Sequence, residues 1–355
     1  MIIQQKELSQ KIESIKSIVP KSGTVPAIQG ILLRDGFLTA TNHEITIKVR
    51  LECAEKESFI IPQKAFDLIK NLPDGEIEIS SDENHAVIIT AGSINNTFQS
   101  IDPELFEAGG FPEKGNSGDM SLDSAELKKC IRNVLYAVDK HSIGQKLGAL
   151  CIGCSDGYLN FAGTDSHVMA WDKVQYDGEE MELLVPRAAA DKILQLDFDG
   201  EVQITSYGNS AVFATEEYIV KTSLLKGPYF SYRKMFTDLP IHVTADRKGL
   251  TEAVGRAAMC IDPDVRIPIR FRFEAGSVRI FLEARNAQYS ETLPVDGMAI
   301  DPILIAFNPK LLIETLKAFD TEKVNISLAG EKKPLIMDAD GMNLRSIVLP
   351  VNIVD

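Results

Sequence analysis

The sequence predicts an α+β protein in which one unit, two helices packed on antiparallel strands, occurs three times along the 355 residues. Two observations carry this prediction. The segment "KAFDLIKNLPDGEIEIS" from Lys64 reads as an apolar helix, a turn and an alternating strand, and it recurs from Arg187 and from Asn308. An apolar stripe of helical spacing precedes each copy. Self-similarity at a nearly fixed step indicates repeated structural units.

The first helix of each unit is marked by apolar residues at i, i+4, i+7 and i+11, which share one face of an α-helix. The three stripes are Leu8, Ile12, Ile15 and Val19; Leu127, Ile131, Val134 and Val138; and Leu250, Val254, Ala257 and Ile261. We expect helices within residues 6–21, 125–146 and 246–256.

Strands of period two follow each first helix. "ITIKVRLE" (45–52) and "RIPIRFRF" (266–273) alternate apolar and polar residues, as a strand does when one face is buried and the other is wet. A short apolar strand then leads into the second helix. These strands are "FIIP" (59–62), "LLVP" (183–186) and "LIAFNP" (304–309), and the helices are expected at 63–71, 187–195 and 309–318. Gly75, Gly200 and Glu322 occupy the equivalent turn after each helix.

Two segments have the composition of linkers. Residues 108–120 are rich in Gly, Pro and Ser, and residues 227–240 precede the third stripe. The predicted domains are therefore 1–117, 118–240 and 241–355, each long enough for its own core. The alternative is that unrelated α+β domains share a generic pattern. Four matching positions on one helix, followed by a matching second helix, argue against it.

The composition is that of a soluble globular protein, with 45% hydrophobic and 25% charged residues. No run approaches the roughly 18 apolar residues of a membrane span, and the start lacks the features of a signal peptide, so we expect a cytoplasmic protein without membrane contact. Five cysteines do not indicate a disulfide framework. Cys151 and Cys154 form a lone CxxC in an apolar strand, and we interpret them as core residues rather than metal ligands. No cofactor is expected.

The net charge of −14 argues by itself against nucleic acid. The six helical segments nevertheless sum to +9, so the rest of the chain carries −23. The cations opposite the apolar stripes, which we expect to face DNA, are Lys6, Lys21, Lys129, Arg132, Lys140, Lys248 and Arg256. The alternative is that surface helices simply favour Lys and Arg. Three like units could pair their sheet edges head to tail and close a ring with a basic bore.

Several stretches resemble the bacterial sliding clamp, the beta subunit of DNA polymerase III. They are "IIPQKAFDLIKNLPDGEIEI", "LNFAGTDSHVMA", "LKGPYFSYRKMF", "IAFNPKLLIETLKAF" and "RSIVLPVNI". The resemblance covers all three repeats. It implies the DNA clamp fold and a head-to-tail homodimer that encircles duplex DNA without sequence preference. It also implies a non-catalytic tether for polymerase subunits, the clamp loader and repair proteins, which bind through short linear motifs.

In the family these motifs enter an apolar pocket between the second and third domains. Carried over by position, the pocket is Leu147, Thr164, Ser166, His167, Val168, Met169, Phe230, Lys234, Met235, Val265, Asn308, Leu311, Pro334, Ile347, Leu349, Pro350 and Val351. The dimer interface would include Lys64, Phe98, Met259 and Cys260. The chain departs from the family pattern where Phe230, Lys234, Ser166 and Val168 replace Pro, Arg, Gly and Arg, and in its longer end. These departures bear on peptide preference and not on the fold.

Two other classes of function stay open, and the first is an enzyme that uses a pocket not recognised in the sequence. Asp165, Ser166 and His167 are the residue types of a hydrolase, but adjacent strand residues point to opposite faces, so we do not expect a nucleophile–base pair. The other alternative is an accessory or mobile-element scaffold with the clamp fold that binds peptides without acting as the main replicative clamp. A stable dimer would distinguish a ring from such a scaffold.

Overall fold

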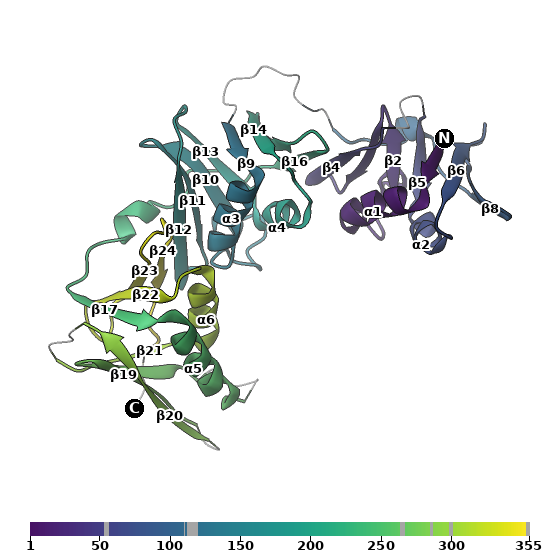
Figure 1. The fold of residues 1–355 in the computed structure, drawn as a ribbon. Coiled ribbons are helices and arrows are strands. Elements are labelled where there is room, and N and C mark those ends of the chain that lie inside the picture. Colours follow the sequence, from purple (N-terminus) through teal and green to yellow (C-terminus); the bar gives the residue numbers. More distant parts are fainter. Residues whose placement is uncertain are drawn as a thin grey trace. The chain divides into compact units, whose positions relative to one another are not determined.

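The computed structural model describes residues 1–52, 57–109, 111, 120–262, 267–284, 287–297 and 301–352 (Figure 1). These residues form six α-helices and 24 strands in three antiparallel sheets, an α+β architecture. The chain divides into two compact units. Unit 1 comprises Met1–Leu127 and Asp191–Leu224, and unit 2 comprises Lys128–Ala190 and Leu225–Asp355.

Unit 1 contains two sheets, in the orders β1-β6-β7-β8 and β5-β2-β3-β4-β16-β15-β14-β9. Its helices are α1 (Gln5–Ile15) and α2 (Gln63–Asn71). Its strands are β1 (Ile2–Gln4), β2 (Gly30–Arg34), β3 (Phe37–Thr41), β4 (Ile45–Arg50), β5 (Phe59–Pro62), β6 (Glu76–Ser81), β7 (Val87–Ala91), β8 (Ile94–Phe98), β9 (Met120–Asp123), β14 (Glu201–Tyr207), β15 (Ser210–Ala214) and β16 (Tyr218–Ser223). The pairing of β4 with β16 makes the larger sheet continuous.

Unit 2 contains one sheet, in the order β13-β10-β11-β12-β24-β23-β22-β17-β20-β19-β18-β21. Its strands are β10 (Ala149–Ser155), β11 (Tyr158–Thr164), β12 (Val168–Gln175), β13 (Met181–Pro186), β17 (Ile241–Asp246), β18 (Ile269–Glu274), β19 (Ser277–Glu283), β20 (Gln288–Asp296), β21 (Ile303–Phe307), β22 (Lys323–Leu328), β23 (Leu335–Asp338) and β24 (Arg345–Val348). Its helices are α5 (Arg247–Met259) and α6 (Pro309–Ala318). Helices α3 (Ser124–Leu135) and α4 (Arg187–Gln195) begin in one unit and end in the other.

The element order confirms the repetition seen in the sequence. Each repeat runs strand, helix, four strands, helix, three strands. In each repeat the first strand joins the last three in one row, and the four strands between the helices form another. Repeats one and two are linked by β4 and β16, and repeats two and three by the equivalent strands β12 and β24. The predicted domain boundaries stay predictions, and the first of them lies outside the described residues.

The second helix of each repeat begins and ends where the sequence predicts, whereas the first helices do not. Helix α1 ends at Ile15 and α3 ends at Leu135, earlier than the apolar stripes. After α1 the chain tightens into a short 3-10 turn, which still directs Val19 into the core. Helix α5 instead continues to Met259, and Ile261 beyond it is only half-buried.

The predicted strands are observed with small differences at their ends. Strand β4 stops at Arg50, and β18 starts only at Ile269. Strand β21 ends at Phe307, because the Asn308 side chain accepts a hydrogen bond from the backbone N–H of Lys310 and caps α6. Cys151 and Cys154 are buried on β10, which confirms their interpretation as core residues of a strand.

A buried carboxylate gives the fold a testable pH dependence. Asp172 is 5% exposed and accepts hydrogen bonds from Asn133 Nδ2 at 2.7 Å and from the Lys173 N–H at 2.8 Å. Burial raises the pKa of Asp172 above 3.8, despite these hydrogen bonds. The folded state therefore binds this proton more tightly than the unfolded state. The resulting contribution to stability is present at low pH and is lost as the pH rises through the raised pKa.

Because an amide does not ionise, we expect Asp172→Asn to gain stability relative to the wild type as the pH rises. The Asn133 amide can rotate so that its hydrogen bond to the new side chain is kept. Urea unfolding of both proteins from acidic to neutral pH would measure the difference in the free energy of unfolding. Asp177→Asn, at an exposed side chain, controls for the loss of one charge. A pH-independent difference for Asp172→Asn would contradict the prediction.

Candidate functional site

The turn between β11 and β12 is held by its own side chains. Thr164 Oγ1 donates to the carbonyl oxygen of Val168 at 2.8 Å and accepts from the Ser166 N–H at 3.1 Å. Asp165 Oδ1 accepts from the N–H groups of His167 and Val168, both at 2.8 Å. Ser166 has a φ of 76°, in the left-handed region. The turn leaves Ser166 and His167 exposed and buries Thr164.

The prediction that Ser166 and His167 are adjacent strand residues that point to opposite faces was therefore wrong. Ser166 and His167 lie in a turn and not in a strand, and Ser166 Oγ is 3.4 Å from His167 Nδ1. Asp165 uses Oδ1 to accept backbone N–H groups, and no hydrogen bond among the described residues joins it to the imidazole that a base would need oriented.

Repeat one contains the same turn, which sequence reasoning missed. Thr41 Oγ1 accepts from the His43 N–H at 3.1 Å, and Asn42 Oδ1 accepts from the Ile45 N–H at 2.8 Å. His43 has a φ of 71°. The signal was present in the likeness of "TNHEI" to "TDSHV". Because different side chains form the same turn in the two repeats, we infer that its hydrogen bonds stabilise the backbone conformation.

The end of the chain lies against this turn. In the register of β12 and β24, Met169 faces Ile347. Beyond β24 the Leu349 N–H donates to the carbonyl oxygen of His167, and the Val351 N–H donates to that of Ala306, both at 2.8 Å. The backbone is thus tied on both sides, while the Leu349 and Val351 side chains are each 39% exposed.

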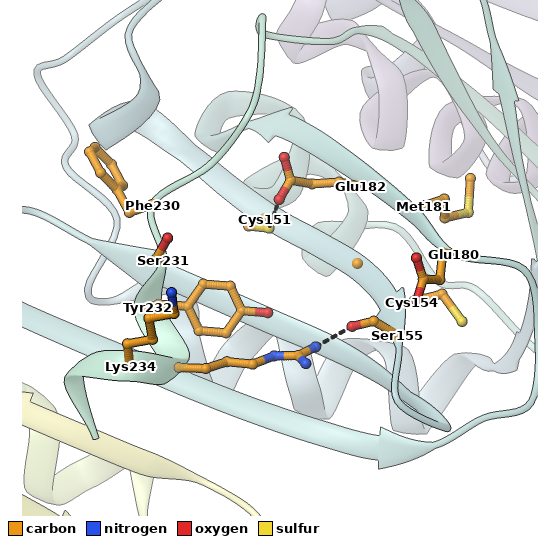
Figure 2. A pocket seen from close by; sticks show the side chains of 12 residues that line it. Cys151, Cys154, Ser155, Glu180, Met181, Glu182, Phe230, Ser231, Tyr232 and Lys234 are labelled. Carbon is orange, nitrogen blue, oxygen red and sulfur yellow. Dashed lines mark hydrogen bonds between the residues drawn. The ribbon is translucent and has the colours of Figure 1, made fainter. Parts of the chain in front are cut away.

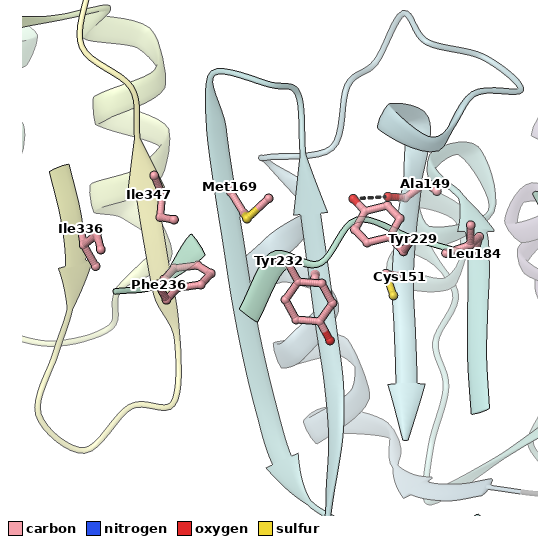
Figure 3. Close-up of a cluster of buried hydrophobic side chains, with 10 residues drawn as sticks. Ala149, Cys151, Met169, Leu184, Tyr229, Tyr232, Phe236, Ile336 and Ile347 are labelled. Atoms are coloured by element: carbon pink, nitrogen blue, oxygen red, sulfur yellow. Dashed lines mark hydrogen bonds between the residues drawn. The ribbon is translucent and has the colours of Figure 1, made fainter. Parts of the chain in front are cut away.

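The segment between repeats two and three packs its aromatic rings on the neighbouring sheet surface. Figure 3 shows Tyr229, Tyr232 and Phe236 lying over β10, β11, β12 and β24, in one buried cluster with Met169 and Ile347. The Trp171 ring lies 5.9 Å from Tyr232 and 5.5 Å from Phe236, centroid to centroid. Burial raises the pKa of Tyr232. This packing fixes the segment that carries Phe230, Lys234 and Met235.

The predicted pocket residues differ in exposure. Those on the surface are Ser166, His167, Lys234, Met235, Asn308, Leu349 and Val351, and those half-buried are Leu147, Phe230, Leu311, Pro334 and Pro350. Thr164, Val168, Met169 and Ile347 are buried, and Val265 lies outside the described residues. Met169 belongs to the aromatic cluster, so the adjacent Val168 points to the opposite face of the sheet and offers no surface contact.

A cavity of about 530 Å³, which the sequence did not indicate, lies beside this segment (Figure 2). Its lining is Cys151, Gly153, Cys154, Ser155, Glu180, Met181, Glu182, Phe230, Ser231, Tyr232, Arg233 and Lys234. It shares Phe230 and Lys234 with the predicted pocket. Glu182 Oε1 accepts from the Tyr229 N–H at 2.8 Å, and Arg233 bonds to Ser155 and Asp156. Burial raises the pKa of the Cys151 thiol, so this lining thiol is not a reactive thiolate.

The seven predicted DNA-facing cations are all exposed, but they differ in their partners. Lys6 lies 2.9 Å from Asp74, and Lys248 lies 3.9 Å from Glu252. Arg256 forms a two-pronged contact with Glu291. Within the described part of the chain, no ion pair involves Lys21, Lys129, Arg132 or Lys140. Sequence reasoning missed Glu291, which is 35 residues from Arg256.

The predicted interface residues lie on or beside two strand edges. Phe98 ends β8, and Met259, which is 85% exposed, ends α5 next to the half-buried Cys260. Lys64 is exposed on α2. Strand β8 pairs only with β7 in the described structure. Residues 288–294 of β20 pair only with β19 there, because β17 reaches no further than Val295.

Two further searches covered the described residues. Among them, no three His, Cys, Asp or Glu side chains are grouped so that they could hold a metal ion. None of the helices in this part of the chain has the length and apolar character needed to cross a membrane.

Comparisons with known proteins agree along the whole chain. The family model of the N-terminal domain of the DNA polymerase III beta subunit matches residues 1–109, and that of its C-terminal domain matches 237–352. The beta sliding clamps of Staphylococcus epidermidis and Staphylococcus aureus are 24% and 23% identical, each over 97% of this chain and 96% of the relative.

Solved structures extend the likeness to the fold. A sliding clamp from Pseudomonas aeruginosa bound to griselimycin superposes with a TM-score of 0.91 at 22% identity, over 99% of both chains. The DNA polymerase III beta subunit of Thermotoga maritima gives a TM-score of 0.87 at 18% identity, again over 99% of both chains.

The turn geometry predicts the effect of one substitution. Ser166→Gly should stabilise the protein by about 0.5–1 kcal/mol, because glycine adopts a positive φ without the steric cost that serine bears. Urea unfolding measures the change. Ser231→Gly, at a φ of −74°, is the matched control and should instead destabilise, because there glycine only adds freedom to the unfolded chain. Equal effects of the two changes would contradict the prediction.

Proposed function

Since the chain belongs to the family of the DNA polymerase III beta subunit, the sliding clamps, we propose that it is a ring-forming processivity factor. It encircles duplex DNA and tethers the replicative polymerase, the clamp loader and repair proteins to it. The observation that carries this proposal is the threefold sheet topology, which leaves one matching pair of strand edges without a partner among the described residues.

The argument follows from the way the repeats are joined. The third of the four strands between the helices of repeat one, β4, pairs with the last strand of repeat two, β16. The equivalent strands of repeats two and three, β12 and β24, pair in the same way. By the same rule, β20 of repeat three should pair with the last strand of repeat one, β8. In the described chain β8 pairs only with β7, and residues 288–294 of β20 pair only with β19, so both have one open side.

Pairing of β20 in one copy with β8 in another is a heterologous, head-to-tail contact. Such contacts form a closed ring when the rotation permits and a filament when it does not. Two copies supply six repeats. The interface would satisfy backbone N–H and C=O groups that an open edge leaves exposed. The apolar Phe98 ends β8, and the apolar Met259 ends α5, the helix that packs against β20.

Duplex DNA would lie against the helices. Exposed cations on the first helices of the repeats favour a phosphate backbone, and phosphate contacts carry no sequence information. Partner proteins would bind beside the end of the chain, where the exposed Leu349 adjoins His167 and the exposed Val351 adjoins Ala306. An apolar surface with few polar groups suits a short peptide with Leu or Phe anchors. We assign no catalytic step to the protein.

An accessory scaffold that binds peptides without closing a ring is the second candidate. The pocket residues that differ from the family pattern, Phe230 and Lys234 among them, are what favours it. Such a scaffold would be monomeric in solution, whereas the ring requires a stable dimer.

The ring has a topological consequence. After loading by its clamp loader, the protein should remain on nicked circular duplex DNA and should dissociate when a single cut linearises the circle. Gel filtration of the complex before and after cutting measures retention, and light scattering on the free protein measures the dimer. Equal retention on circular and linear DNA would exclude encirclement.

The peptide site is tested at a side chain that is not part of the core. Met169 packs in the aromatic cluster, so its replacement would confuse binding with folding. We expect Leu349→Asp to weaken a polymerase-derived peptide about tenfold or more, because a charge would face the apolar anchor. Fluorescence anisotropy with labelled peptide measures the affinity. Tyr207→Asp, at a comparably exposed side chain in unit 1, is the control. Unchanged affinity for Leu349→Asp would place the site elsewhere.

A further inference from the structure

Arg256 on α5 is held by a carboxylate from the neighbouring strand. Its Nη2 donates to Glu291 Oε1 at 2.7 Å, and its Nε donates to Glu291 Oε2 at 3.0 Å. This is the side-by-side geometry in which a guanidinium binds a carboxylate most strongly. Nη1 also lies 3.9 Å from Glu252 Oε2 on the same helix. The sequence, read as a helix alone, placed Arg256 among the cations that face DNA.

Glu291 is itself held in position. The Tyr289 hydroxyl donates to its carboxylate and lies 3.3 Å from the carbonyl oxygen of Ala253 on α5. The hydrogen bonds from Arg256 and then from Tyr289 keep the pKa of Glu291 below its ordinary value, so it is ionised at neutral pH. The side chain is 26% exposed, against 47% for Arg256. The carboxylate is therefore a fixed counter-charge.

The other two cations of α5 also have polar partners. The Arg247 Nε donates to the carbonyl oxygen of Thr321 at 2.6 Å, and Lys248 lies near Glu252. Residues 246–256 carry three cations against Asp246 and Glu252, and Glu291 makes the group neutral. The surface of α5 thus has no net charge to offer a polyanion.

The first helix of repeat two differs on each of these points. Lys129, Arg132 and, in the turn after α3, Lys140 are exposed and form no ion pair with a described residue. Two acidic side chains of unit 2 near these cations are engaged otherwise. Asp172 is buried, and Asp139 accepts hydrogen bonds from the His141 N–H and from Ser142. Residues 128–146 hold five cations and one acid.

We propose that Glu291 withdraws Arg256 from DNA binding, so that the phosphate backbone contacts unit 2 mainly through Lys129, Arg132 and Lys140. This inference rests on the proposed function and specifies which of the cations perform it. A phosphate that contacts Arg256 through Nη1 meets a guanidinium whose charge Glu291 already balances, and a phosphate that takes the Nε and Nη2 side must displace Glu291. The released carboxylate then binds a cation from solution, so the net number of counterions released on binding does not increase. Arg256 should therefore add little to affinity or to its salt dependence.

Glu291→Gln is the decisive variant, because it frees Arg256 without removing it. Anisotropy of a labelled linear duplex, titrated over a range of salt concentrations, measures affinity and the slope of log K against log salt. We expect Glu291→Gln to bind more tightly and to steepen the slope by about 0.9, the value for one added phosphate contact. Arg132→Gln should make the slope shallower by a similar amount, and Arg256→Gln should leave it nearly unchanged.

Two controls separate this effect from a general change in charge or fold. Glu283→Gln removes an acid that pairs at 3.7 Å with Arg270 on the adjoining strands, and it should change the slope less than Glu291→Gln does. In the double variant Glu291→Gln/Arg256→Gln the gain should disappear, which a folding defect would not produce.

The possible outcomes distinguish the two levels of the argument. If Arg256→Gln weakens binding as much as Arg132→Gln, or if Glu291→Gln leaves the slope unchanged, the withdrawal of Arg256 is refuted while DNA binding stands. If the wild type fails to bind duplex at low salt, both this inference and the proposed contact with DNA are overturned.

Discussion

The architecture depends on one constraint: the backbone hydrogen-bonding groups at the edge of a strand need a partner strand. Each repeat ends in rows of backbone N–H and C=O groups, and the chain satisfies them by joining repeat to repeat through β4 with β16 and β12 with β24. This joining makes the sheets continuous across repeats. It also places the end of β24 beside the β11–β12 turn, so that Leu349 reaches His167. The candidate peptide site therefore exists only because two repeats share a sheet.

The sequence predicted the repeats well because their signals are local. An apolar stripe, a short strand and a turn glycine each act within a dozen residues, and the second helices agree with the structure at both ends. The ends of the first helices could not be read in this way. A 3-10 turn after Ile15 keeps Val19 on the buried side, so the stripe continues beyond the α-helix. Periodicity alone does not distinguish the α-helix from the 3-10 turn that follows it.

The candidate sites were only partly predictable because they depend on partners that are distant in sequence. Helical spacing placed Arg256 on the outer face of α5 correctly, but nothing near it announces Glu291 on β20. The strand reading of Ser166 and His167 failed because the Thr164 and Asp165 side chains turn the backbone there. The buried position of Val168 follows from alternation with Met169, which a list of matched positions does not take into account.

If an acidic chain is to bind DNA as proposed, the positions of its unpaired cations determine where a phosphate can make contact. Pairing a cation with a carboxylate leaves the net charge unaltered but removes that cation from the contacts with a phosphate. In a ring, the link to DNA is topological, so tight phosphate contacts are unnecessary and would oppose sliding. Lys129 and Arg132 on α3, which form no ion pair with a described residue, together with the neutralised cations of α5, would give weak contacts on part of the surface. In the proposed ring, this arrangement would attract the duplex during loading and hold it loosely afterwards.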